Sequence, residues 1–465
     1  MLHETPRKSN KKYLSTFSIA MLSLGSVLSL RSLPFLAHHG LAIIFYYGMA
    51  VTFFMIPYAV IAADLVSIFP GGVFVWVKEA FGPRLGFFSI WLQWFHSIPW
   101  YPAVLSFFAI SIARMVFPEL STNKFFVWFV ILIMFWGLTF INFLHLSFSS
   151  YLSTICLFIG TIIPGALLIG MAIIWLIKGN PSFISFSSKE ILPQSKGLMG
   201  SIAMISAAFL TFTGLETNAN LILDMKNPKK NYPIALFIAA GLLFFFLVTG
   251  TLSIAMVIPK NEINLITALI DALGTLLTCT GQTWPLKILS IAILFGIIGQ
   301  LNVWLSGPAR GLWHSANYGC LHPIFTKVNI NNSPVVILIF QAILVSIVAS
   351  CFLFISNFNF AYWILSLFCT QLTLTMYIVM IFAAIVLHHR YPEKKRKDGL
   401  LKTKFSIWTV SLTGLISIFY TFGVGFIPPT ALVPQNLRFT YALAIIGGFL
   451  ACISLPFLVY YNKKK

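Results

Sequence analysis

The chain has 465 residues, of which 58% are hydrophobic and only 9% are charged, and its mean hydropathy is +0.91. About a quarter of the residues in a soluble domain are Asp, Glu, Lys or Arg, so this composition excludes a soluble protein and indicates a membrane protein. Lys and Arg number 30 against 11 Asp and Glu, a net charge of +19. Nucleic-acid binding would need that charge on a soluble face, so we interpret the excess as a signal of membrane orientation.

The apolar runs are long and do not alternate with polar residues, which favours spanning helices of about 20 residues over the strands of a barrel. We therefore predict an all-α, polytopic membrane protein with twelve transmembrane helices in a single domain, residues 1–465, and number the helices span 1 to span 12. The spans are expected at residues 13–36, 41–68, 86–113, 125–145, 151–177, 199–223, 233–257, 286–308, 334–355, 360–387, 405–427 and 441–461.

Basic residues divide unequally between the two sides of the membrane. Twelve spans place both termini on one side, and 21 of the 30 Lys and Arg fall on that side against 8 on the other, with Arg31 inside span 1. This bias predicts cytoplasmic termini, with residues 1–12 as a cytoplasmic tail. Residues 388–404 form a basic cytoplasmic loop, which we expect to contact anionic lipid. Span 1 lacks a small-residue cleavage site, so we interpret it as a retained helix rather than a signal peptide.

Spans 1 and 6 carry the polar residues that suggest a binding site. The sequence shows no metal-binding, phosphate-loop or nucleotide motif, so we expect no cofactor, no metal and no enzyme activity, and favour a secondary transporter. In many such transporters paired helices break near the middle of the membrane and bind the substrate there. Span 1 has Ser23, Gly25 and Ser26 in its first half, whereas span 6 has Thr213 and Gly214 at its centre.

A break in each helix would suit an amino acid. The N-terminus of a half helix favours a carboxylate, and exposed carbonyl groups favour an ammonium group, so two facing breaks would bind both charges of a zwitterion. The alternative is that Gly25 and Gly214 only permit close helix packing.

Glu216 is the one acid that we place well inside a span, because Asp64 lies within two turns of the cytoplasmic end of span 2. A carboxylate in lipid is costly and usually faces a cavity or a partner, so we assign Glu216 to the binding site. The alternative is a structural hydrogen bond to broken backbone. Whether this side chain takes up a proton during transport is a further hypothesis.

Four stretches carry a resemblance to a known family: GGVFVWVKEAFGPRLGF from Gly71, TGLETNANLILDMKNPKKNYPIA from Thr213, LSIAMVIPKNEINL from Leu252 and GPARG from Gly307. They resemble the bacterial glutamate/γ-aminobutyrate antiporters of the amino acid, polyamine and organocation superfamily. The resemblance implies a LeuT-like, five-plus-five inverted repeat of residues 13–178 and 199–387, with residues 405–461 outside it. It also implies exchange of amino acids or their decarboxylation products across the bacterial inner membrane.

The resemblance assigns further residues one at a time. Glu216 matches the acid that follows the break in helix 6, and Trp304 matches the tryptophan ahead of the GPxRG stretch, where it could contact the ligand or fill space. Arg31 stands where the family has an aromatic residue, and it could line the outer vestibule or extend to the interface. Gln371 and Thr375 roughly replace two tyrosines of helix 10. We therefore treat Arg31, Gln371 and Thr375 as candidate gate or specificity residues.

The predicted function is exchange of an amino acid, glutamate-like or other, for a related amino acid or amine. One alternative is a proton-coupled symporter in which Glu216 carries the proton, and another is a receptor or channel without turnover. The type member of the family has a C-terminal plug, whereas this chain ends at Lys465 directly after span 12, so we expect no plug-based pH gate.

Overall fold

The computed structural model describes residues 14–144, 146–192, 205–264, 267–278, 281, 284–354, 358–393, 399–426 and 438–461. The predicted N-terminal tail 1–12, the first residues of span 6 (199–204) and part of the basic loop (394–398) lie outside the described residues.

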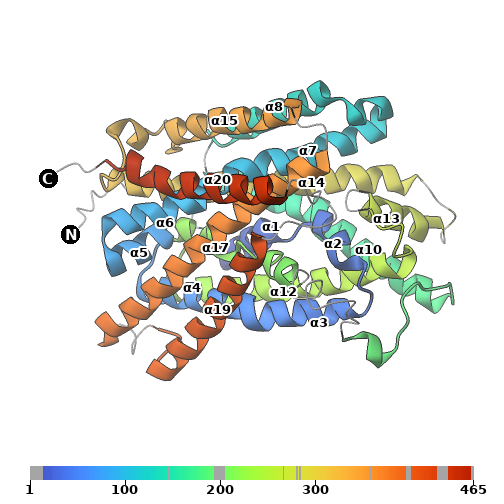
Figure 1. The fold of residues 1–465 in the computed structure, drawn as a ribbon, viewed down its shortest axis with the longest axis horizontal. Helices are drawn as coiled ribbons and strands as arrows, with labels where there is room; N and C mark the ends of the chain where they lie inside the picture. The colour runs from blue at the N-terminus through green and yellow to red at the C-terminus, as the bar shows by residue number, and fades with distance from the viewer. Residues whose placement is uncertain are drawn as a thin grey trace.

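The described helices follow one another in the order in which the spans were predicted (Figure 1). Spans 1 to 5 correspond to α1 (Thr16–Val27), η1 (Leu30–Ser32), α2 (Pro34–Ala37), α3 (Ala42–Ala50), η2 (Val51–Met55), α4 (Ile56–Ile68), α6 (Pro83–Phe95), α7 (Ser97–Val116), α8 (Lys124–Ile141), α9 (Leu146–Leu157), η4 (Phe158–Ile162) and α10 (Ile163–Ile177). Spans 6 to 12 correspond to a helical segment at 205–210, η6 (Leu215–Asp224), α12 (Pro228–Val257), α14 (Pro285–Asn317), α15 (Val335–Ala349), α16 (Cys351–Phe354), α17 (Phe358–Arg390), α19 (Lys404–Gly425) and α20 (Arg438–Val459). The connections contain α5 (Val73–Phe81), η3 (Pro118–Thr122), η5 (Ser188–Glu190), α13 (Ala268–Thr278) and η7 (Pro323–Thr326).

Nine of the helices in the described part of the chain are long and apolar enough to cross a membrane, and these account for every predicted span except 1, 6 and 12. Spans 1 and 12 appear as shorter apolar helices, and span 6 is divided. The prediction of a polytopic, all-helical membrane protein with breaks in spans 1 and 6 is therefore confirmed.

The boundaries differ from the predictions at several ends. Helix α14 continues to Asn317, nine residues beyond the expected end of span 8. Neither Pro308, which lies in its interior, nor the glycines beside it end the helix. Helix α17 continues through Arg390, so the first residues of the expected basic loop are helical. Helix α13 was not predicted, because its 11 residues are too few to cross a membrane.

Helix α14 is the central packing element, and it contacts α9, η4, α6, η6 and α1. Its close approach to span 5 depends on paired glycines, because a Cβ on Gly160 would lie 2.0 Å from the backbone nitrogen of Gly296. Small residues allow this kind of backbone contact in membrane helices. The short helix α1 lies at the centre of the bundle among longer helices (Figure 1).

Both ends of the described chain lie at the same end of the bundle. Leu14 forms an isolated parallel bridge with Met225, which follows η6 directly. Tyr461 donates its backbone N–H to the carbonyl of Cys320, which follows α14, at 2.9 Å. Lys78 and Arg84 contact this same end, with Lys78 Nζ 4.5 Å from the ring centroid of Tyr318. This placement agrees with an even number of spans.

Candidate functional site

The break in span 1 lies later in the helix than the sequence suggested. Helix α1 continues through Val27, and the chain becomes extended at Leu28 and Ser29 before η1 begins. The predicted residues Ser23, Gly25 and Ser26 are therefore helical. A Cβ on Gly25 would meet Leu157 at 3.6 Å, an ordinary packing distance, and the Ser26 hydroxyl donates to the Ser23 carbonyl at 2.7 Å. Serine hydroxyls bonded in this way are compatible with a helix, which explains why the polar stretch did not break it.

The break in span 6 lies where it was predicted. Residues 211–214 form a turn between the helical segment 205–210 and η6. Gly214 has φ +109° and ψ 0°, a left-handed conformation that glycine adopts at little cost. A Cβ at this position would also lie 2.6 Å from Trp304 Cζ2. The chain therefore requires glycine here for two independent reasons.

Direct hydrogen bonds join the two breaks. The Ser26 hydroxyl also donates to the carbonyl of Gly214 at 2.9 Å. The carbonyl of Ser26 in turn accepts from Trp304 Nε1 at 2.7 Å and from Gln300 Nε2 at 3.3 Å, both on α14. Three of the predicted residues, Ser26, Gly214 and Trp304, therefore meet at one point.

Glu216 lies just after the break in span 6, with a relative exposure of 1%. Its Oε2 accepts from the Tyr377 hydroxyl at 2.7 Å, and its Oε1 accepts from Gln93 Nε2 at 3.4 Å. Tyr377 itself accepts the N–H of Gly214 at 2.8 Å, and Gln93 accepts from Asn220 Nδ2 at 2.8 Å.

The directions of these hydrogen bonds indicate which kind of ligand group Glu216 could bind. The oxygens of Tyr377 and Gln93 accept from the Gly214 N–H and the Asn220 amide, which leaves the Tyr377 hydroxyl and the Gln93 amide to donate to the two oxygens of Glu216. Among the residues that the structure describes, no Lys, Arg or His forms an ion pair with Glu216. The site therefore presents a buried acceptor whose bonded partners are all neutral.

Aromatic side chains enclose the breaks. The rings of Tyr58 and Tyr377 stack at 4.9 Å, and Tyr58 donates its hydroxyl to the carbonyl of Phe212, in the turn of span 6. His96 meets the indole of Trp304 edge-on at 4.9 Å. Spans 2, 8 and 10 and the junction of α6 and α7 thus supply the aromatic walls, and the breaks supply the polar centre.

Comparison with known proteins identifies the family to which the chain belongs. A family model described as amino acid permease matches residues 14–450. The chain belongs to the amino acid permease family. An uncharacterized transporter of Legionella pneumophila is 34% identical over 97% of each chain. A glutamate/gamma-aminobutyrate antiporter of Lactococcus lactis subsp. cremoris is 28% identical over 98% of this chain and 92% of its own length. A protein of Lactococcus lactis subsp. lactis named as a probable agmatine/putrescine antiporter is 23% identical over 70% of this chain and 69% of its own.

Two residues that contact Glu216 in this permease, Gln93 and Tyr377, were not predicted. Both are polar groups within long apolar spans, which could have drawn attention to them. Sequence alone does not show which face of a buried helix such a residue occupies, so this signal would not have separated Tyr377 from Gln371 or Thr375.

Gln371 and Thr375 have their polar contacts elsewhere in the permease. Gln371 Nε2 donates to the carbonyl of Phe422 on α19 at 3.2 Å, and the Thr375 hydroxyl donates to the Gln371 carbonyl at 2.8 Å. Tyr377, two residues further along, is the α17 residue that reaches Glu216. The Thr213 hydroxyl bonds within its own segment, to Leu210 at 2.9 Å.

Arg31 lies in η1, directly after the break in span 1 of the permease, and is partly buried. Its guanidinium carbon lies 5.9 Å from the ring centroid of Phe107 on α7. The side chain therefore lies against span 3, in the segment between the break and α2.

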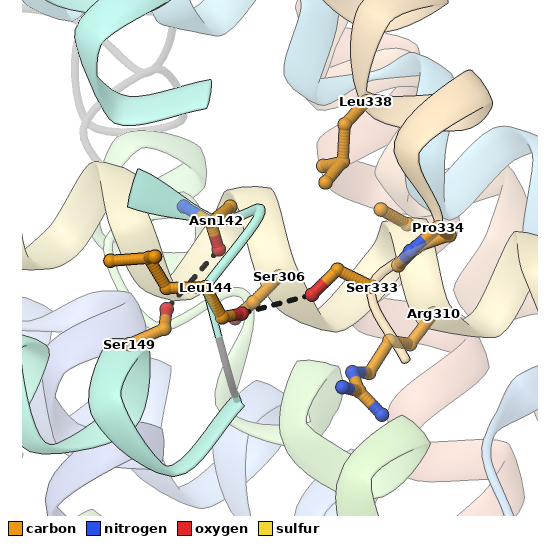
Figure 2. Close-up of a pocket in the computed structure, with 9 residues that line it drawn as sticks. Asn142, Leu144, Ser149, Ser306, Arg310, Ser333, Pro334 and Leu338 are labelled. Atoms are coloured by element: carbon orange, nitrogen blue, oxygen red, sulfur yellow. Dashed lines mark hydrogen bonds between the residues drawn. The ribbon is translucent and has the colours of Figure 1, made fainter. Parts of the chain in front are cut away.

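Arg310 lies on a different side of α14 from Trp304. Figure 2 shows it at a small pocket that is also lined by Asn142, Ser149, Ser306 and Ser333. At 3.6 residues per turn, Ser306 and Arg310 are both well over 90° from Trp304 around the helix. This pocket therefore faces spans 4, 5 and 9 of the permease rather than the two breaks.

The permease has a second buried acid, Asp64 near the end of α4, with 0% exposure. Its Oδ2 bonds to His388 Nε2 on α17, and its Oδ1 accepts the N–H groups of Leu400 at 2.6 Å and Leu401 at 2.8 Å. One side chain thus connects span 2 to the end of span 10 and to the segment before span 11. We call these four residues the Asp64 clamp.

Proposed function

We propose that this permease exchanges an amino acid for a related amino acid or amine across the bacterial inner membrane, with both termini in the cytoplasm. The antiporter names of two relatives support exchange, and the excess of Lys and Arg on the side of the termini supports the orientation. Substrates of this class carry an ammonium group, an α-carboxylate, or both.

The observation that carries the proposal is the meeting of two helix breaks beside a buried carboxylate. A broken helix leaves N–H and C=O groups that a polar ligand can bind, and in transporters such breaks mark the substrate site. Ser26, Gly214, Glu216 and Trp304 form the centre of the proposed site, and Ser23, Gly25 and Thr213 support it. The Glu216 carboxylate lacks a bonded cation among the described residues, so an ammonium group of the substrate suits it.

The proposed cycle is alternating access. Spans 1, 2, 6 and 7 rock against the remaining spans and open the site first to one side and then to the other. Residues 13–178 and 199–387 act as the two inverted repeats, and each begins with a broken span. Spans 11 and 12, residues 405–461, lie outside the repeats.

Counterflow in liposomes tests this proposal. Purified permease is reconstituted into vesicles preloaded with single amino acids or amines, and uptake of one labelled amino acid is measured with and without a pH gradient. Exchange predicts fast uptake only when a substrate is inside. Equally fast uptake into empty vesicles without a gradient would contradict it. Glu216→Gln is expected to abolish the uptake, and Glu79→Gln, on the surface, serves as the matched control.

The second candidate is proton-coupled symport, with Glu216 as the proton carrier. The observation that favours it is that Glu216 is bonded to neutral donors and has no ion pair among the described residues, so a proton could neutralise it in place of an ammonium group. In that case a pH gradient alone drives uptake into empty vesicles, and Glu216→Gln uncouples uptake from the gradient. The same vesicle experiment therefore separates the two candidates.

A further inference from the structure

We propose that one anionic phospholipid binds in a groove between α17 and α19, with its phosphate held by His389 and Arg390 and an acyl chain along the groove. The groove has a volume of about 570 Å³, and its lining is Ile385, Val386, His389, Arg390 and Trp408. The two helices pack side by side in this region (Figure 1). This inference does not depend on which substrate the permease carries.

The walls of the groove suit a hydrocarbon chain. Ile385 and Val386 come from the last turns of α17, and the indole of Trp408, on the second turn of α19, forms the opposite wall. Beside it, Phe382 is 44% exposed and Leu412 is 48% exposed. In a chain that spans a membrane, such side chains face lipid, and a Trp near the end of a spanning helix lies at the level of the headgroups.

The polar end of the groove suits a phosphate group. Arg390 Nη1 donates to the carbonyl of Glu79 at 2.8 Å, which fixes the guanidinium, and no described residue forms an ion pair with Arg390. Its remaining N–H groups can therefore donate to phosphate oxygens. His389 Nδ1 donates to the carbonyl of Ile385 at 2.8 Å, so Nε2 is the nitrogen left for a ligand, and it donates to a phosphate oxygen when the ring is protonated.

The surrounding charge favours an anionic lipid over a zwitterionic one. Arg390, Lys402 and Lys404 are exposed around the ends of α17 and α19, and Glu393 is the one exposed acid described beside them. Basic residues at a membrane surface attract anionic lipids. The rings of His389 and Trp408 meet edge-on, with their centroids 6.0 Å apart. The proposed phosphate-binding residue His389 therefore lies next to the apolar wall of the groove.

The position of the groove connects the lipid to the fold. His388 directly precedes His389 and Arg390, and it is buried in the Asp64 clamp, where it bonds to Asp64 of span 2. A lipid bound to His389 and Arg390 would therefore hold the end of α17 at the point where it is joined to span 2. This arrangement predicts that the bound lipid stabilises the permease.

Quenching of Trp408 fluorescence by lipids with brominated chains tests the proposal. The permease is reconstituted in phosphatidylcholine with small fractions of brominated phosphatidylglycerol or brominated phosphatidylcholine, and the Trp408→Phe variant isolates the signal of Trp408. We expect stronger quenching of Trp408 by the anionic lipid. Arg390→Gln should weaken that preference by about fivefold, since one cation near the surface contributes about this factor. Arg390→Lys, which keeps the charge, should retain most of it.

The opposite end of the molecule provides a matched control. Trp284 is 64% exposed and lies three residues before the exposed Lys287, so this pair has a tryptophan and a cation without the groove. Lys287→Gln should leave the quenching of Trp408 unchanged. Equal quenching of Trp408 by both brominated lipids would overturn the proposal, and so would a preference that survives in the folded double variant His389→Gln/Arg390→Gln. Folding of each variant is checked by its elution as a monodisperse peak.

Discussion

The indole of Trp304 occupies the space that a side chain on Gly214 would need. A Cβ on Gly214 would lie 2.6 Å from Cζ2 and 3.1 Å from Cη2 of that indole, and the Trp304 Nε1 donates to the carbonyl of Ser26 in span 1. The glycine at the break in span 6 is thus packed against the residue that connects span 8 to span 1. The indole therefore cannot move toward span 6 without moving the break.

Gly214→Ala should abolish or strongly reduce exchange. A left-handed conformation at a non-glycine residue costs about 1–2 kcal/mol, and overpacking against Trp304 costs about 1–3 kcal/mol more. Uptake in preloaded vesicles measures the loss. Gly137→Ala in α8 is the matched control, because Gly137 lies outside the proposed site and nothing is within 4 Å of the position that its Cβ would take. A Gly214→Ala variant with the uptake of the wild type would show that the break tolerates a side chain.

Tyr377→Phe should weaken substrate binding without unfolding the permease. The change removes one donor from Glu216 and leaves the buried N–H of Gly214 without its acceptor. A hydrogen bond to a charged group contributes about 1.5–3 kcal/mol, and without it the carboxylate is no longer held in place for the substrate's ammonium group, so we expect roughly a tenfold rise in the concentration for half-maximal exchange. Tyr47→Phe is the control, since Tyr47 bonds only to Thr251, at 3.3 Å, away from Glu216. Equal effects of the two changes would exclude a specific role for Tyr377.

The candidate site could be predicted from the sequence in part. Glu216 and Gly214 are recognisable because a carboxylate and a glycine among small polar residues are scarce in an apolar span. The break in span 1 was placed too early, because Ser23, Gly25 and Ser26 are compatible with a helix as long as the serine hydroxyl bonds within it. The extended backbone at Leu28 and Ser29 has no comparable signal, since the residues directly beside it, Val27 and Leu30, are apolar.

Contacts between distant spans could not be predicted at all. Asp64 was expected near the end of its span and lies there, but its full burial was not predicted, since its donors come from Leu400 and Leu401, more than 330 residues away in the chain. Tyr377 faces Glu216 while Gln371 faces α19, and only the packing of α17 against its neighbours decides between them. Composition and hydropathy define the spans, whereas the faces of the spans depend on the folded bundle.

Asp64→Asn should destabilise the permease more than any change to a surface acid. The change replaces the buried carboxylate that accepts from the N–H groups of Leu400 and Leu401 and bonds to His388, and disrupting such buried hydrogen bonds costs about 1–3 kcal/mol or more when the acceptor is charged. Thermal unfolding in detergent measures the loss. Glu79→Gln is the control, because its ion pair with Lys78, at 2.9 Å, is partly exposed and such pairs contribute about 0–1 kcal/mol. Equal unfolding temperatures for the two variants would contradict the role of the Asp64 clamp.

Arg31→Gln should change which substrates the permease prefers. Arg31 follows the break in span 1 and lies against Phe107. In the proposed orientation this half of span 1 faces outward, so we expect the charge of Arg31 to lie near the outer route to the site. A cation on this route attracts substrates with an additional carboxylate, and its removal should reduce the apparent affinity for acidic amino acids by about fivefold, equivalent to about 1 kcal/mol, relative to neutral ones. Competition for labelled uptake in preloaded vesicles, with a panel of acidic and neutral amino acids, measures this ratio. Lys260→Gln removes an exposed cation that follows span 7, on the same side, and should leave the ratio unchanged. If both variants shift the ratio equally, the effect comes from general surface charge and Arg31 has no specific part in substrate choice.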